Sequence, residues 1–158
     1  MIKLCRVDHR LLHGQVAFSW CHAVGANCIL VASDEAAADE IRMATMRLAK
    51  PAGTRLVIKS IADSVKAINS GVTDKYQLLI VTGSVADAAR LAQECAAITA
   101  VNLGGTKKSS GTVKSFEPAL HLTEEDCRCL KALAAKGIEL EVRQVPSDKK
   151  TVLTEKHF

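Results

Sequence analysis

The chain has 158 residues, of which 48% are hydrophobic and 24% charged, and its formal net charge is +4 at pH 7. This length and balance predict a single globular domain over residues 1–158, and no apolar run reaches the roughly 18 residues that a membrane span needs. The N-terminus shows no signal-peptide pattern, so we expect a cytoplasmic protein without direct membrane insertion. The weak positive charge is compatible with an acidic or phosphorylated partner and does not by itself predict binding to nucleic acid.

The six cysteines lie mostly in apolar segments and form no CxxC pair, which favours reduced core thiols over a disulfide framework. Cys127, Cys129 and His121 are close in sequence. However, residues two apart on a helix face different sides, so we predict no metal site there. Nothing in the sequence indicates a cofactor.

Residues 2–7 read as a strand, and a helix follows over 15–24 with Val16, Trp20 and Val24 at helical spacing. His13 therefore falls in the loop between them. In an open parallel sheet such a loop lies at the carboxyl edge of the strands, where ligands bind and where helix N-termini offer free N–H groups to anions.

Short apolar runs then alternate with amphipathic stretches. Further strands are expected at 28–32, 55–59, 78–81, 99–102 and 138–142. A helix from about Glu35 is expected to place Ala37, Ile41, Ala44 and Leu48 on one face and to end at 51–53. Three more helices should begin at Ser60, Ser84 and Thr123. An aspartate stands three residues after each of these residues, which is the pattern of a capping box. The alternation predicts an α/β fold with helices on both faces of an open, mainly parallel twisted sheet.

Two segments interrupt this alternation. Residues 102–116 are rich in glycine, serine and lysine and are expected to form a loop or short hairpin. The glycines of Asn102 to Gly105 could let the backbone approach a phosphate, but a tight turn is their commoner meaning, and we expect a supporting loop. Lys107 and Lys108 could dock a partner or simply be solvated. The tail from Ser147 reads as a short helix or frayed end. Ser33 to Glu35 could border a cleft, although a helix N-cap is the commoner meaning.

The loop residues suit phosphoryl transfer. A neutral imidazole nitrogen of His13 is nucleophilic near neutral pH without a separate base. Arg10, and Arg6 as a second candidate, can supply a guanidinium fork for phosphoryl oxygens, and the N–H groups around Gly14 and Gln15 can hold the anion. Asp8 is more plausible as an organiser of an arginine or of the imidazole tautomer than as a proton acceptor.

Each of these residues also has a simpler interpretation. A histidine in a loop is commonly a solvated surface residue, and Arg6 and Arg10 could be surface charges that fix the loop. Asp8 could cap the turn through an Asx-type hydrogen bond. His9 is treated as background.

The sequence Arg-Val-Asp-His-Arg-Leu-Leu-His-Gly-Gln-Val at 6–16 resembles the active-site signature of the IIB component of the mannose/fructose/sorbose family of bacterial sugar phosphotransferase systems. Segments 29–35, 101–105 and 136–144 support the resemblance in the same order, so it covers nearly the whole chain. Thr106 stands where the family often has Met.

The resemblance implies a phosphocarrier with an open parallel sheet, a protein-Npi-phosphohistidine–sugar phosphotransferase. It would take a phosphoryl group from phosphorylated IIA on Nδ1 of His13 and pass it to a hexose-type sugar on the IIC/IID permease at the inner face of the plasma membrane. By resemblance, Arg6, Asp8 and Arg10 also fall on family positions. The alternative is a non-catalytic module that binds an anion or small ligand at the same strand-to-helix edge. The sugar and the oligomeric state stay open.

Overall fold

The computed structural model describes residues 1–158 and is built on one seven-stranded sheet of order β3-β2-β4-β1-β5-β8-β9. All neighbouring strands are parallel except β9, which runs antiparallel to β8. The strands are β1 (Ile2–Asp8), β2 (Cys28–Ala32), β3 (Arg55–Lys59), β4 (Leu78–Thr82), β5 (Ala100–Gly105), β8 (Glu139–Val142) and β9 (Thr151–Leu153). The expected α/β fold with a mainly parallel sheet is confirmed.

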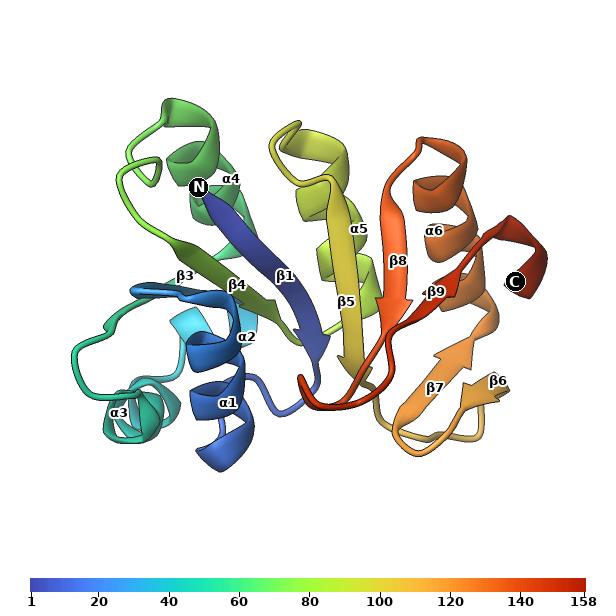
Figure 1. Ribbon diagram of the computed structural model, residues 1–158, viewed down its shortest axis with the longest axis horizontal. Helices are drawn as coiled ribbons and strands as arrows, with labels where there is room; N and C mark the ends of the chain where they lie inside the picture. Colours follow the sequence, from blue (N-terminus) through green and yellow to red (C-terminus); the bar gives the residue numbers. More distant parts are fainter.

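Helices cover both faces of this sheet (Figure 1). Helices α1 (Gly14–Val24), α2 (Asp34–Ala37) and α3 (Glu40–Ala49) lie on the face toward the viewer, and α4 (Ile61–Ser70), α5 (Val85–Glu94) and α6 (Glu124–Ala135) lie behind it. Each face buries its own apolar cluster, of 24 residues under α4–α6 and 11 residues under α1–α3. None of the helices combines the length and apolar character that crossing a membrane requires.

The three expected helix starts are confirmed. The side chains of Ser60, Ser84 and Thr123 accept hydrogen bonds from the backbone N–H groups three residues later. Only Thr123 forms the reciprocal capping box, because Asp126 also accepts from the Thr123 N–H. All six cysteines are free thiols, and four of them are buried.

The helix expected from Glu35 is in fact two helices. Asp39 accepts a hydrogen bond from the Arg42 N–H at 3.0 Å and so caps a new helix, α3. The new start changes which side of α3 meets the sheet: Met46 is buried, whereas Ile41 and Leu48 are 82% and 90% exposed. The prediction that Ala37, Ile41, Ala44 and Leu48 share one face that packs against the core is therefore wrong.

The glycine-rich segment and the tail also differ from expectation. Asn102 to Gly105 form the buried end of β5 rather than a turn. The strands β6 (Thr112–Phe116) and β7 (Leu120–Thr123) follow and form an antiparallel hairpin. Of the two structures expected for this segment, a loop or a short hairpin, the hairpin is therefore the one observed. The tail contributes β9 to the sheet edge and then a 3-10 turn at Glu155–His157, because Leu153 is buried against the main core.

Candidate functional site

The loop between β1 and α1 has an unusual backbone. Leu11 has a positive φ of 59° and Gly14 one of 40°. The left-handed region costs a branched side chain about 1 kcal/mol, which tertiary packing must offset. The Leu11 N–H donates to the Asp8 carbonyl at 2.8 Å, and the side chains of Leu11 and Leu12 are buried in the cluster under α1. The hydrogen bond to Asp8 and the burial of Leu11 and Leu12 thus fix the loop, while the side chain of His13 stays partly exposed.

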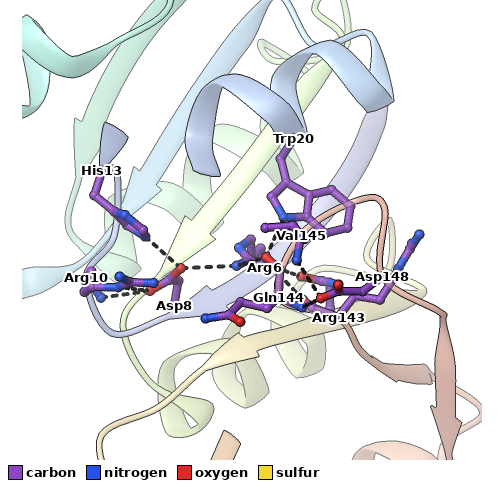
Figure 2. Close-up of polar contacts among 10 residues, drawn as sticks. Arg6, Asp8, Arg10, His13, Trp20, Arg143, Gln144, Val145 and Asp148 are labelled. Carbon is purple, nitrogen blue, oxygen red and sulfur yellow. Dashed lines mark hydrogen bonds and ion pairs between the residues drawn. The ribbon is translucent and has the colours of Figure 1, made fainter. Parts of the chain in front are cut away.

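His13 occupies the N-cap position of α1 with extended dihedrals and makes no side-chain capping bond. Its Nε2 lies 3.1 Å from Asp8 Oδ2, and its side chain is 24% exposed (Figure 2). The Nδ1 atom has no hydrogen-bond partner in the protein. The N–H groups of Gly14, Gln15 and Val16, in the first turn of α1, likewise donate to no protein acceptor. A free ring nitrogen therefore adjoins the positive end of a helix dipole.

Asp8 uses its two carboxylate oxygens for different tasks. Oδ1 accepts the backbone N–H of Arg10 at 3.0 Å, which is the Asx-type turn expected from sequence. Oδ2 faces both His13 Nε2 and, at 3.2 Å, Arg6 Nη2. Burial by itself raises the pKa of Asp8, but the hydrogen bonds from His13 and the Arg10 backbone and the charge of Arg6 outweigh it and lower the pKa. The carboxylate is thus ionised at neutral pH and accepts a hydrogen bond from the Nε2–H of His13.

Arg6 is buried, with 3% of its surface exposed, so its interpretation as a surface charge is wrong. Its guanidinium donates to Asp8 Oδ2, to Asn102 Oδ1 at 2.6 Å and to the carbonyls of Arg143 and Gln144 at 3.0 and 2.8 Å. Burial lowers its pKa and Asp8 opposes that shift, yet an arginine stays protonated. With these donors engaged, Arg6 is placed to hold Asp8 rather than to reach a phosphoryl group.

Gly104 makes room for Arg6. Strands β1 and β5 are in register with Arg6 beside Asn102, and the guanidinium extends over the end of β5. A Cβ added at Gly104 would overlap the Arg6 guanidinium, whereas one added at Gly105 would meet Ala119 at an ordinary 3.7 Å. Gly104 therefore serves the close approach of the Arg6 side chain, and neither glycine forms a turn, because both belong to β5.

We expect Gly104→Ala to destabilise the fold by about 3 kcal/mol, because the buried Arg6 must move and lose partners that compensate its charge. Urea denaturation followed by circular dichroism measures this loss. The matched control is Gly105→Ala, which should change the unfolding midpoint little. Equal midpoints for the two variants would contradict the assignment of Gly104 to Arg6.

Arg10 is the exposed cation of the site. Its side chain is 48% exposed, and its Nε lies 3.6 Å from Asp8 Oδ1, an ion pair that leaves the Nη donors free. Lys107 and Lys108 are exposed and have no ion-pair partner. The predicted residues Asp8, Arg10, His13, Gly14 and Gln15 therefore lie together where β1 leads into α1. Arg6 supports them through its hydrogen bond to Asp8.

Ser33 is the helix N-cap that the sequence favours, and the cavity that it lines does not include His13. It caps α2 by accepting the Ala36 N–H at 3.2 Å. It also lines, with Asp34, Arg42 and Asp87, a polar cavity of about 260 Å³ beside the loop. His9 lines the same cavity, and its Nδ1 is buried without a hydrogen-bond partner.

Comparison with known proteins identifies the family of the chain. A family model described as "PTS system sorbose subfamily IIB component" matches residues 2–156. The chain belongs to this family. As a IIB component it is 35% identical over 161 residues to a probable phosphotransferase enzyme IIB component of Streptococcus pyogenes, with 98% of each chain covered. It is also 34% identical over 150 residues to the mannose-specific EIIAB component of Escherichia coli, covering 95% of this chain and 46% of that protein.

Solved structures agree with this assignment. The IIB component superposes on the IIB domain of the sorbose permease from Klebsiella pneumoniae with a TM-score of 0.89 at 26% identity, covering 96% of this chain and 92% of that one.

Four residues that support the site of the IIB component were not predicted from the sequence: Trp20, Glu141, Arg143 and Gln144. Arg143 pairs with Glu141 at 2.7 and 2.9 Å and stacks on the Trp20 ring, with its Cζ 5.0 Å from the centroid. Arg6 stacks on the same ring at 5.2 Å, and the Trp20 Nε1–H donates to the Gln144 carbonyl at 3.1 Å. Figure 2 shows Arg143 and Gln144, which follow β8, lying next to Arg6. The only signals in the sequence are the single tryptophan and the Arg-Gln pair within 136–144.

Proposed function

We propose that this IIB component carries a phosphoryl group on Nδ1 of His13. The observation that supports the proposal is the contact of Nε2 with the buried Asp8 carboxylate, which assigns the ring proton to Nε2 and leaves the Nδ1 lone pair as the nucleophile. The N–H groups of Gly14 and Gln15, which donate to no protein acceptor, and the exposed guanidinium of Arg10 would then bind the phosphoryl oxygens.

In the forward step, the Nδ1 lone pair attacks phosphorus as the bond from phosphorus to the donor group of IIA breaks. In-line positioning and neutralisation of the oxygen charge are the main demands of such a transfer. In the second step a sugar hydroxyl oxygen attacks the phosphorus, the N–P bond breaks and the hydroxyl proton is released. Asp8 stabilises the positive charge that the ring acquires while Nδ1 is bonded to phosphorus.

The proposed partners are phosphorylated IIA, the IIC/IID permease and a hexose-type sugar, with the carrier acting on the cytoplasmic side of the membrane. The mannose-specific relatives support the pairing with IIA, because their name joins an A and a B component in one protein and this chain spans 46% of it. In catalytic terms the chain would be a protein-Npi-phosphohistidine–sugar phosphotransferase. The exposed Arg10, Lys107 and Lys108 would attract an acidic phosphorylated face.

The proposal is tested by incubating the purified chain with phosphoenolpyruvate, the general phosphotransferase proteins and a matching IIA. We expect one phosphoryl group per chain that is labile in acid and stable in base, located by tandem mass spectrometry in the peptide containing His13. Omission of IIA should prevent labelling. A chain that stays unlabelled with an active IIA, or a label that survives acid, would instead favour the non-catalytic anion-binding module.

Replacing Arg10 with lysine should slow phosphoryl transfer about tenfold, because an ammonium group is a point charge and lacks the planar fork that matches two phosphoryl oxygens. Rapid-quench kinetics with phosphorylated IIA measure the rate. The matched control is Arg47→Lys on the exposed side of α3. Equal rates for Arg10→Lys and the unmodified chain would show that only the charge at position 10 matters.

A further inference from the structure

A second cavity lies at the opposite end of the sheet from His13. It has a volume of about 270 Å³ and is enclosed by β2, β3, the start of β4, α4 and the turn after α4. Cys28, Arg55 and Leu78 line it and are register partners at the amino ends of their strands. His13, by contrast, follows the carboxyl end of β1. In Figure 1 this region is at the upper left, where α4 lies beside β3.

The alternation of side chains along β3 builds this cavity. Leu56 and Ile58 point to one face of the sheet and pack against the cluster under α1–α3. Arg55, Val57 and Lys59 point to the other face and line the cavity. Because β3 is an edge strand, this row is only partly buried by α4. The register with β2 sets Val57 beside Leu30, so an apolar floor lies between two cations.

A third cation comes from the turn after α4. Lys75 lines the cavity, and its Nζ lies 5.2 Å from the centroid of the Tyr76 ring, while Arg55 Cζ lies 5.5 Å from the same centroid. No Asp or Glu lines the cavity. Arg55, Lys59 and Lys75 take part in none of the ion pairs of the protein. The rim of this cavity thus carries unpaired positive charge around an apolar interior.

From this combination we infer that the cavity binds a small amphipathic carboxylate, with one aromatic ring or a short branched chain. The volume of about 270 Å³ is just below the range of roughly 300–1,000 Å³ for ligand cavities, so it suits a small molecule of about ten non-hydrogen atoms. The hydrocarbon part packs on the floor of Leu30, Val57 and Leu78, and the carboxylate accepts hydrogen bonds from the guanidinium of Arg55 and the ammonium of Lys75. A bare phosphate would leave this apolar floor unused. The site is separate from the phosphoryl carrier.

Phenylacetate is the probe, and phenylacetamide is its uncharged analogue of the same shape. We expect phenylacetate to bind the full chain with a Kd of about 1 mM or tighter, measured by chemical shifts of backbone amides. The shifts should cluster at the starts of β2 and β3 and in the turn 71–76. Phenylacetamide should bind at least about tenfold more weakly, because it forms no charge-assisted contact.

Variants separate this site from a general surface effect. Arg55→Gln and Lys75→Gln should each weaken phenylacetate about fivefold, and Ala67→Leu, which fills the cavity from α4, should prevent binding. The matched control is Lys66→Gln, one residue away on the exposed side of α4. Cations on an edge strand can also serve only to discourage sheet pairing between molecules. In that case no saturable binding occurs, and this result would overturn the inference, as would shifts at the His13 edge or equal affinities for the acid and the amide.

Discussion

Replacing His13 with alanine is expected to abolish the acid-labile phosphoryl label. No other side chain of the loop has a free ring nitrogen at the start of α1, and Arg10 and the helix N–H groups can only bind the group, not carry it. The test uses the complete system of donor proteins and IIA, with radiolabelled phosphoenolpyruvate and autoradiography of the chain.

The fold should survive this change. His13 caps α1 without a side-chain hydrogen bond, and Asp8 keeps its bonds to Arg6 and to the Arg10 backbone. The cost is therefore about 1 kcal/mol for the lost contact with Asp8. His22→Ala, on the exposed side of the same helix, is the matched control and should be labelled as the unmodified chain is. A label retained by His13→Ala would refute the proposed carrier.

The sequence predicts the loop well because its parts are local. Asp8, Arg10, His13 and Gly14 lie within seven residues, and a strand-to-helix connection in a parallel sheet brings such residues to one edge whatever the rest of the chain does. The capping residues Ser60, Ser84 and Thr123 are predictable for the same reason, since each bond spans three residues. Alternation of strands and helices then determines the fold class.

The support beneath the loop could not be predicted in this way. Arg6 meets Asn102 and the carbonyls after β8, contacts that span 96 to 138 residues of sequence. Its burial depends on the missing side chain of Gly104, and a pair of glycines after an apolar run is far more commonly a turn. The orientation of α3 failed for a different reason: Asp39 starts a new helix, so periodicity counted through it mixes two helical faces.

The buried carboxylate is the next most sensitive position. Asp8→Asn should slow phosphoryl transfer to His13 about a hundredfold or more, although the side chain keeps its size. An amide can donate to Nε2, which would move the ring proton to Nδ1 and occupy the lone pair that attacks phosphorus. It also removes the negative charge 3.1 Å from the ring during transfer. Long-range proton–nitrogen NMR of the imidazole should show the Nε2–H tautomer in the unmodified chain and a shift toward Nδ1–H in the variant.

Acid titration tests the same contact through stability. The pKa of Asp8 is lower in the folded chain than the unfolded value of about 3.9. The stabilisation from its ionised form is therefore complete above about pH 4 and disappears as pH falls through the lowered folded pKa. In urea denaturation at decreasing pH, the free energy of unfolding of Asp8→Asn should fall less than that of the unmodified chain. Asp63→Asn, at an exposed carboxylate in the first turn of α4, should lose as much as the unmodified chain. If both variants lose stability in parallel with the unmodified chain, Asp8 is not the carboxylate that the site holds ionised.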